Sequence, residues 1–301
     1  MSTRGSALAL WQAHTVRDVL VAAHPDCDVE ILTVRSTGDR DQATDLARFG
    51  SIGIFTVEVD RALLDGRAQI GVHSLKDLTT VLQDGIVLAS VHRRGPVEDV
   101  LITGSGATLD ELPAGARVAT GSSRRRAMLL RARPDLQVVE IRGNVETRLG
   151  KLDSGECEGL VMARAGLVRL GLEERITEVL DTERFLPAVG QGIVGLTCRE
   201  DDAETRERLA LVCHMPSWWA GISERALLRR LHGGCNAPVG GHATVVGEEL
   251  QLAARVLSLD GTVCVAGECQ GPASQAEELG ESLADELLGR GARALVEASR
   301  A

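Results

Sequence analysis

Hydrophobic and polar positions alternate along most of the chain in the order expected of an α/β protein. Residues 7–23 carry apolar side chains at helical spacing, and residues 29–34 form a short apolar stretch typical of a strand. A helix-like stretch at 60–67 leads into an apolar segment at 70–72, and a further strand-like segment lies at 159–163. Strands that alternate with helices predict largely parallel sheets with helices on their faces.

A different pattern begins near residue 214. It predicts one amphipathic helix at 217–231, strands at 243–247, 251–257 and 262–268, and helices at 276–288 and 292–299. Strands that follow one another, with helices after them, indicate a small α+β domain with a three-stranded antiparallel sheet. Gly95-Pro96 and the loose stretch at 104–106 mark a boundary within the preceding α/β part.

Composition restricts the class of protein further. The chain has 301 residues, 44% of them hydrophobic, which suits a globular protein of two or three domains. No window approaches the roughly 18 uncharged apolar residues of a membrane helix, and the N-terminus does not resemble a secretory signal. We therefore expect a cytoplasmic protein without membrane contact. The net charge of −10 and only six aromatic residues argue against a nucleic-acid binder.

The seven cysteines are scattered and never form a Cys-x-x-Cys pair, so we expect reduced thiols and no metal site. Cys235 differs from the others because glycines precede it and Pro238 follows it. This composition predicts an exposed loop of fixed conformation. Its thiol could be inert, a nucleophile or an attachment point, and the residues alone leave all three open.

Arginine is concentrated in one region of this acidic chain. Residues 124–148 contain no lysine and seven arginines, namely Arg124, Arg125, Arg126, Arg131, Arg133, Arg142 and Arg148. A guanidinium binds a carboxylate or phosphate through two parallel hydrogen bonds and keeps its charge at any working pH. The small-residue turn at 119–123 precedes the first three arginines, and a helix is predicted over 127–133.

Arg142 ends the strand-like stretch 136–141, and Arg148 lies in the helix predicted after it. Two successive strand-to-helix turns therefore bring cations to one edge of a sheet, where open α/β sheets bind ligands. We predict a site for a ligand with several planar acid groups. The alternative is a solvated helix face, which is what most runs of charge are.

His73-Ser74-Leu75-Lys76-Asp77 follows the apolar segment 70–72, so a cation and a carboxylate adjoin at a strand end. The alternative is a turn in which Asp77 caps a helix and Lys76 is solvated. The segment 190–195 matches the G-x-G-x-x-G fingerprint, but it opens a strand rather than a helix, so no dinucleotide site is expected.

Taken together, the motifs of the chain resemble those of the porphobilinogen deaminase family, whose members are also called hydroxymethylbilane synthases. The motifs lie at 4–12, 73–78, 120–125, 142–149, 165–171, 190–192, 224–225 and 233–235, in the family's order and approximate spacing. The resemblance extends to about Pro238. Beyond that point the C-terminal part is similar in length and pattern only.

This resemblance implies an α/β fold with two lobes like those of type II periplasmic binding proteins, followed by a small α+β domain. The expected domains are 1–94 with 192–213, then 95–191, and finally 214–301. It also implies a transferase of haem and tetrapyrrole synthesis that joins four porphobilinogen molecules head to tail. Each addition releases ammonia, and the product is the linear hydroxymethylbilane. A monomer is expected, with a possible hand-off of product to uroporphyrinogen-III synthase.

The resemblance also implies a dipyrromethane cofactor joined by a thioether to Cys235. Asp77 would stabilise the azafulvenium cation left when ammonia departs, and Lys76 would assist by holding carboxylates. The residues implied in binding carboxylates of cofactor and substrate are Arg4, Ser6, Gln12, Thr120, Ser122, Arg124, Arg125, Arg142, Arg148, Arg169 and Gln191. Porphobilinogen carries an acetate and a propionate, so a growing chain of such units suits an arginine cluster.

The chain departs from the family pattern at Ile52, where a lysine is usual, and Arg48 or Arg126 could compensate for the missing charge. A competing hypothesis is a two-lobed solute-binding protein that holds a small dicarboxylate or oxyanion without covalent attachment. A transcription regulator is a third, weaker hypothesis, because no helix-turn-helix pattern is evident.

Overall fold

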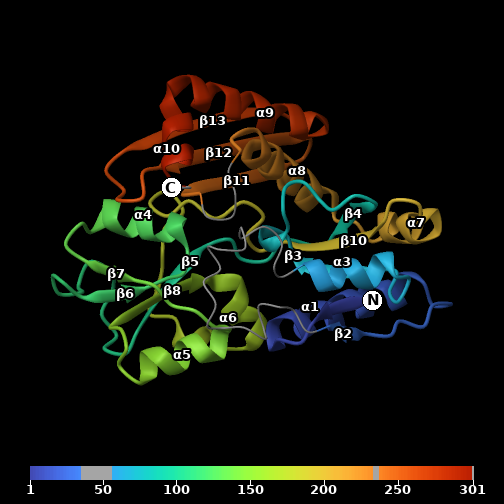
Figure 1. Ribbon diagram of the computed structural model, residues 1–301, viewed down its shortest axis with the longest axis horizontal. Coiled ribbons are helices and arrows are strands. Elements are labelled where there is room, and N and C mark those ends of the chain that lie inside the picture. The colour runs from blue at the N-terminus through green and yellow to red at the C-terminus, as the bar shows by residue number, and fades with distance from the viewer. Residues whose placement is uncertain (35–55, 233–236, 300–301) are drawn as a thin grey trace.

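The computed structural model describes residues 1–34, 56–232 and 237–299, which form three sheets. Two α/β lobes lie side by side, and the C-terminal helices and strands lie above them in the view of Figure 1. Cys235, Ile52 and Arg48, which the sequence singled out, lie outside the described residues. No helix within the described ranges is both long and apolar enough to cross a membrane.

The first lobe contains a mixed five-stranded sheet in the order β2-β1-β3-β10-β4. Its strands are β1 (Ser2–Arg4), β2 (Leu32–Val34), β3 (Gly71–Ser74), β4 (Ile86–Val91) and β10 (Val194–Arg199), and its helices are α1 (Ala7–Ala23), α3 (Val57–Leu64) and α7 (Ala203–Leu211). β1 pairs with β2 and β3 in parallel, whereas β10 pairs antiparallel with β3 and β4. The chain therefore leaves this lobe after β4 and returns to it with β10.

Helix α1 has the bounds that the apolar spacing predicts. Its first turn is fixed because the Ser6 hydroxyl accepts a hydrogen bond from the Ala9 amide at 3.3 Å. Ala13, Val16 and Leu20 are buried at helical spacing against the sheet.

The second lobe has a five-stranded sheet in the order β7-β6-β8-β5-β9. Its strands are β5 (Asp99–Thr103), β6 (Arg117–Ala119), β7 (Gln137–Val139), β8 (Gly159–Ala163) and β9 (Glu178–Val179), and its helices are α4 (Ser123–Ala132), α5 (Val145–Asp153) and α6 (Arg164–Leu170). A helix was predicted over 127–133, but its predicted start was wrong, because α4 begins at Ser123. Ser122 accepts a hydrogen bond from the Arg125 amide and caps α4, so Arg124, Arg125 and Arg126 occupy the first turn.

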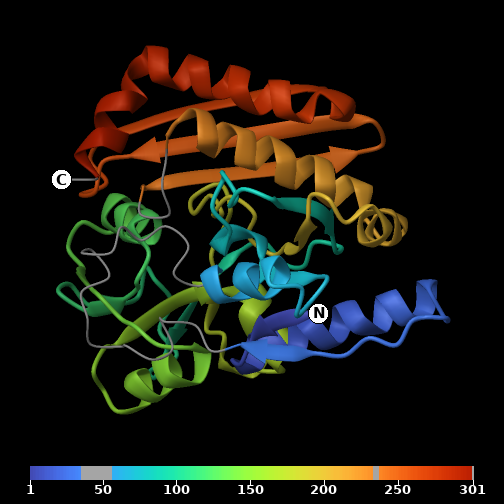
Figure 2. The ribbon, with the colours of Figure 1, turned by 45° about the vertical axis from the view of Figure 1, so that its right-hand side comes forward.

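The third sheet is antiparallel, in the order β11-β12-β13. It consists of β11 (Val239–Val246), β12 (Glu249–Leu257) and β13 (Cys264–Pro272), and its helices are α8 (Met215–Arg230), α9 (Ala276–Leu287) and α10 (Arg293–Ala298). Leu227, Leu250 and Leu283 join α8, the sheet and α9 in one core. A Cβ atom at Gly280 would lie 2.2 Å from the Ser223 carbonyl oxygen, so the glycine lets α8 and α9 approach closely. Figure 2 shows both helices running along the strands of this sheet.

These sheets confirm the predicted fold class of two α/β lobes and a small α+β domain with three antiparallel strands. Single-turn helices connect some of the elements: η2 (Leu75–Asp77), η3 (Glu173–Arg175), η4 (Ala273–Gln275) and the π-turn η5 (Leu288–Ala292). The two connections between the lobes are hydrogen-bonded to each other, because the Gly95 amide donates to the Gly192 carbonyl at 3.0 Å. The predicted domain boundaries remain a prediction.

Candidate active site

The turn η2, residues 75–77, presents Lys76 and Asp77 at the end of β3. It is anchored by Leu75, which is buried and whose amide donates to the Ile193 carbonyl at 2.9 Å. Asp77 is exposed, and its carboxylate forms no hydrogen bond or ion pair with another described residue. A fixed backbone with a free carboxylate is suited to stabilise positive charge that develops on a bound molecule.

Lys76 lies beside Asp77 but is directed toward the second lobe. Its ammonium donates to the Gln191 side-chain oxygen at 3.4 Å. Burial and, to a smaller extent, the charge of Arg125 lower the pKa of Lys76 to about 8, while Asp77 and Asp99 act in the opposite direction. The Lys76 ammonium therefore interacts electrostatically with two carboxylates, Asp77 and Asp99, and with two arginines, Arg124 and Arg125.

Asp99 is the fully buried centre of an ion cluster that we call the Asp99 cluster: Asp99, Arg124, Arg125 and Gln191. Its two carboxylate oxygens each lie 2.7 Å from a guanidinium, one from Arg124 and one from Arg125. The Gln191 amide donates to the same carboxylate at 2.9 Å. Burial alone would raise the pKa of Asp99, but the charges of Arg124 and Arg125 outweigh it and hold the pKa well below its usual value.

Sequence reasoning missed Asp99. The sequence did contain a signal, because Asp99 is the first residue of an otherwise apolar strand. An unpaired charge would be costly to bury there, so a partner was to be expected. The structure also commits the predicted ligand residues Arg124 and Arg125 to partners within the chain. Arg124 is 3% exposed and donates to the Leu186 carbonyl at 2.7 Å as well. Their direct contact with a ligand's carboxylates stays a prediction.

Arg148, on α5, faces the same region as Asp77. Its Nε donates to the Gly143 carbonyl at 2.8 Å, which fixes the side chain beside the turn that precedes α5. Burial lowers the pKa of Arg148, the charge of Arg125 adds to this effect, and Asp77 opposes it. Asp77 and Arg148 thus interact electrostatically across the space between the lobes.

Arg142 is placed differently from Arg148. Its guanidinium is exposed and lies 2.8 Å from the Glu140 carboxylate, two residues before it. Arg126, the suggested substitute for the missing lysine, is also exposed and donates to the Val138 carbonyl at 2.7 Å. Among the described residues, neither arginine forms a hydrogen bond or ion pair with the Asp99 cluster or with Lys76, and the roles assigned to them stay predictions.

The N-terminal residues of the predicted site share a small cavity of about 70 Å³ with Asp77. Its polar lining consists of Arg4, Ser6, Gln12, Thr56, His73, Ser74 and Asp77. The Gln12 amide is held by the Ser74 hydroxyl at 2.8 Å, and Ser6 caps α1. The structure therefore brings the predicted site residues Arg4, Ser6 and Gln12 together with Asp77 around one cavity.

Arg169 connects the two lobes. It lies on α6 with its guanidinium carbon 5.4 Å from the centre of the Trp11 ring of α1, and it donates to the Gly192 carbonyl at 2.6 Å. Burial lowers the pKa of Arg169 to about 10. Thr120 accepts a hydrogen bond from the Ser122 amide at 3.2 Å, so these two predicted residues order the loop before α4.

A second buried ion pair joins the C-terminal domain to the connection between the lobes. Arg94 lies 2.6 Å from the Glu224 carboxylate, which also accepts from the amides of Gly190 at 2.6 Å and Ala243 at 2.7 Å. The sequence singled out Glu224 only as part of a family motif, and it gave no sign of Arg94. This pair positions helix α8 against the segment that carries Gln191.

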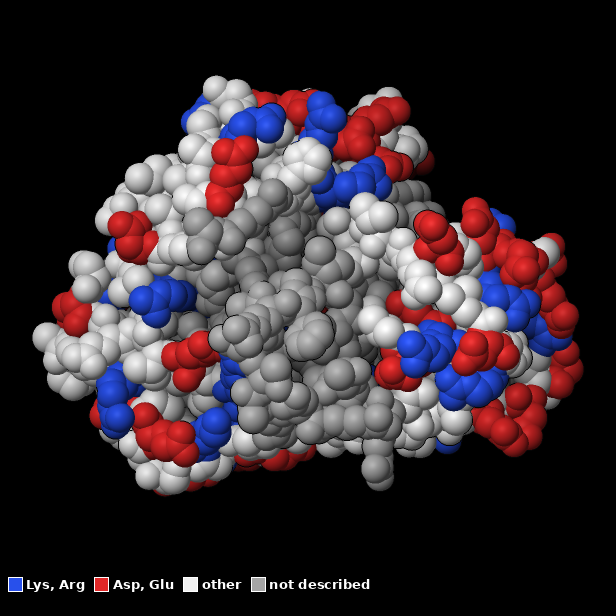
Figure 3. Space-filling model, in the orientation of Figure 1, with Lys and Arg blue, Asp and Glu red and all other residues white. Residues whose placement is uncertain are grey.

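The cations beside Asp77 can bind several carboxylates, because Lys76, Arg125 and Arg148 together outnumber the single buried carboxylate Asp99. A dipyrromethane carries carboxylates and pyrrole N–H groups, so this set of donors with one free acceptor fits such a group. On the face shown in Figure 3, described acidic and basic residues are interspersed rather than gathered in one basic surface. No group of three metal-ligating side chains occurs in the described part of the chain.

The fold and the site define a two-lobed α/β protein in which several cations lie near one exposed carboxylate, Asp77. Residues 1–207 match the family model described as "Porphobilinogen deaminase, dipyromethane cofactor binding domain", and residues 218–289 match "Porphobilinogen deaminase, C-terminal domain". The chain therefore belongs to the porphobilinogen deaminase family. Family membership makes it a transferase of tetrapyrrole synthesis with porphobilinogen as substrate and a domain that binds dipyrromethane.

Among solved structures, the chain is similar to the VFT2 domain of BvgS from Bordetella pertussis, with 19% identity, a TM-score of 0.41, and coverage of 66% of this chain and 76% of that one. It is also similar to a TRAP periplasmic solute-binding protein from Desulfovibrio salexigens, with 12% identity, a TM-score of 0.42, and coverage of 73% and 74%.

Proposed function

We propose that this chain condenses four porphobilinogen molecules on a dipyrromethane bound through Cys235, with Asp77 as the catalytic carboxylate. The observation that carries the proposal is the contrast around η2, where an exposed carboxylate with no hydrogen-bond or ion-pair partner among the described residues lies near several partly or fully buried cations. Bound dipyrromethane would supply the pyrrole carbon to which the first substrate unit is added.

Asp77 acts where positive charge develops. When the bond between the aminomethyl carbon and its nitrogen breaks, the electron pair leaves with the nitrogen, which departs as ammonia after taking a proton. The pyrrole ring left behind is cationic, and the Asp77 carboxylate stabilises it by accepting a hydrogen bond from the ring N–H. The new carbon–carbon bond then forms, and the attacked pyrrole carbon loses its proton, for which Asp77 is the nearest candidate base.

Lys76, Arg148 and Arg4 hold the acetate and propionate groups on either side of Asp77. Their charges orient the ring and do not take part in bond breaking, so they contribute through binding and alignment. Arg125 contributes by keeping the Asp99 cluster cationic overall and by lowering the pKa of its neighbours. Thr120, Ser122 and Gln191 hold the loops from which these cations extend.

The proposal includes a monomeric enzyme that can pass hydroxymethylbilane to uroporphyrinogen-III synthase. The competing hypothesis, a solute-binding protein, needs no covalent group and no release of ammonia. The intact mass of the purified protein separates the two, with Cys235→Ser as the test variant and Cys264→Ser as a matched control, because Cys264 is a half-buried thiol outside the site.

We expect wild type and Cys264→Ser to carry an added mass equal to two condensed porphobilinogen units, and Cys235→Ser to lack it. Both loaded proteins should release ammonia from porphobilinogen. An unmodified wild type that binds porphobilinogen reversibly, without ammonia release, would favour the solute-binding hypothesis.

A further inference from the structure

Helix α8 contacts the segment around η2 through two residues that are four positions apart. A Cβ atom at Gly221 would lie 2.9 Å from a terminal carbon of Leu75, so the absence of a side chain lets α8 press against the residue that anchors the turn. Arg225 donates to the Thr79 carbonyl at 2.8 Å and to the carbonyls of Leu78 and Thr80 at 3.4 Å each. Residues four apart share one face of a helix, so one face of α8 contacts the chain on both sides of Lys76 and Asp77.

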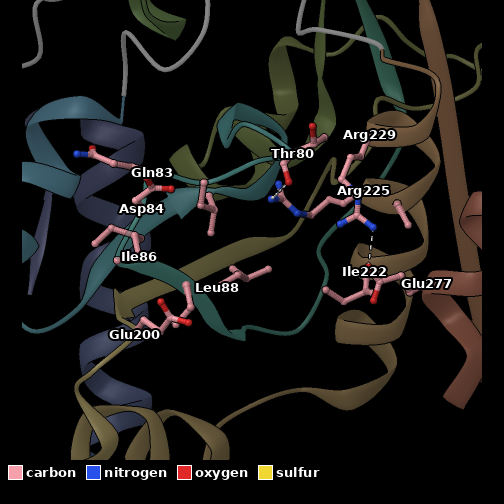
Figure 4. A pocket seen from close by; sticks show the side chains of 14 residues that line it. Thr80, Gln83, Asp84, Ile86, Leu88, Glu200, Ile222, Arg225, Arg229 and Glu277 are labelled. Carbon is pink, nitrogen blue, oxygen red and sulfur yellow. Dashed lines mark hydrogen bonds and ion pairs between the residues drawn. The ribbon is translucent and has the colours of Figure 1, made fainter.

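The contact made by Arg225 is local. Beyond it, α8 and β4 are separated by a cavity of about 550 Å³. Figure 4 shows Ile86 and Leu88 of β4 on one side of this cavity and Ile222, Arg225 and Arg229 of α8 on the other. Since the space between the two elements is open there, Arg225 is the polar link by which α8 holds residues 78–80.

Arginine suits this role better than other residues. A planar guanidinium has five N–H donors in a fixed arrangement, so it can bind several carbonyl oxygens at once, whereas a lysine ammonium is a single point charge on a flexible chain. Arg225 is only 8% exposed, and it donates to the main-chain carbonyls of three successive residues, 78–80. Arg229, one turn later, is more exposed and pairs with Glu277 and Glu281 of α9.

We propose that Arg225 is a positioning residue for Asp77, acting through the backbone of residues 78–80. This inference rests on the proposed function, in which Asp77 is catalytic. In the sequence, α8 ends at Arg230, shortly before Cys235. The helix that fixes the backbone after Asp77 is therefore the helix that precedes the proposed attachment cysteine in the sequence.

The test compares Arg225→Ala and Arg225→Lys with Arg229→Ala, which removes an arginine from the same helix but leaves residues 78–80 untouched. Three quantities are measured on each purified protein: the intact mass, the values of kcat and KM for porphobilinogen, and amide hydrogen exchange in a peptide covering residues 75–84. The intact mass shows whether each variant carries the same covalent group as the wild type.

We expect Arg225→Ala to lower kcat about ten- to a hundredfold with KM changed less than about threefold, because a displaced catalytic group loses alignment rather than binding. Hydrogen exchange in residues 75–84 should become faster. Arg225→Lys should recover part of kcat, and Arg229→Ala should match the wild type in all three measurements.

Equal kcat and equal exchange in Arg225→Ala and Arg229→Ala would overturn the inference while leaving the proposed function in place. If Arg225→Ala does not fold, a wild-type kcat and exchange rate in Arg225→Lys would overturn it as well. If the wild type itself releases no ammonia, the proposed function fails. The exchange measurement then still decides whether Arg225 holds this segment.

Discussion

Asp77 and Asp99 are two carboxylates that both act on Lys76 but lie in opposite environments. Asp99 is fully buried, and two guanidiniums and a glutamine amide occupy its oxygens. Asp77 is exposed and has no hydrogen bond or ion pair to another described residue. Lys76 lies between them, and both carboxylates raise its pKa against the effect of burial.

This difference in environment indicates which of the two carboxylates is able to interact with a ligand. An oxygen that already accepts charge-assisted hydrogen bonds inside the protein has no free capacity for a ligand, and breaking those bonds leaves buried charges uncompensated. An exposed carboxylate on a fixed turn can still accept hydrogen bonds from a ligand, because no buried interaction has to be broken first. Asp99 thus organises the arginines, and the proposed function assigns contact with the substrate to Asp77.

Replacing Asp77 should give the largest effect on activity. Asp77→Ala should fold like the wild type and lose about a hundred- to a thousandfold in kcat, because developing positive charge loses its stabilising carboxylate. Steady-state rates of ammonia release measure this, with circular dichroism as a check of folding. Asp84→Ala is the matched control, since Asp84 is also exposed and lies on the same stretch of chain. Equal rates in the two variants would remove Asp77 from the mechanism.

Replacing Asp99 should act on stability instead. Asp99→Ala leaves Arg124 and Arg125 buried without their counter-charge, and we expect a loss of about 3–5 kcal/mol in the free energy of unfolding. Urea denaturation measures it. In the neighbouring control, Glu98→Ala, the lost ion pair with Arg164 is partly exposed, so a change of about 1 kcal/mol or less is expected. Similar losses in both variants would contradict the distinction.

Asp60 shows what a buried carboxylate does without an arginine. It is 6% exposed, and burial raises its pKa to about 6, although a hydrogen bond from Thr56 opposes the shift. A raised pKa means that the folded state binds more protons than the unfolded state between about pH 4 and 6, so Asp60 lowers stability as pH rises through that window.

Asp60→Asn should therefore be more stable than the wild type above pH 6, by up to about 3 kcal/mol, and the gain should shrink toward pH 4. Thermal unfolding of both proteins at several pH values measures it. A stability difference that does not change with pH would show that Asp60 does not titrate in this window.

The smallest expected effect concerns Lys76. Because its pKa is about 8, the free protein loses this positive charge as pH rises through 8, and carboxylate binding weakens. We expect KM for porphobilinogen to rise about three- to tenfold between pH 7 and 9, and to rise less in Lys76→Arg, which stays charged. Lys151→Arg, at the edge of the second lobe, should behave like the wild type. A KM independent of pH would contradict this.

The sequence predicted what is encoded locally. The spacing of apolar residues predicted α1, and the alternation after Pro238 predicted the antiparallel sheet. The start of α4 was missed because Arg124 and Arg125 look like surface residues. Only Asp99, distant in sequence, makes their burial possible. The antiparallel return of β10 is likewise a long-range pairing that no local pattern indicates.

The sequence predicted which residues belong to the site better than it predicted how they are arranged in space. Lys76, Asp77, Arg125 and Arg148 do face one region, as the strand-end argument indicated. Arg142 lies at a strand end too, but its exposed position and its pair with Glu140 depend on how the turn is oriented. Arg94 and Arg225 bind acceptors on other elements; Arg94 left no signal in its own neighbourhood, and Arg225 was singled out only as part of the family motif at 224–225.

The most direct test of the central claim is the intact mass of the wild type and of Asp77→Ala, before and after brief exposure to porphobilinogen. The account predicts the same covalent group on both proteins at the start. The wild type should then gain successive masses, each equal to one porphobilinogen less one ammonia, and Asp77→Ala should gain them far more slowly. Stepwise gains at equal rates in both proteins, or no gain in the wild type, would contradict the account.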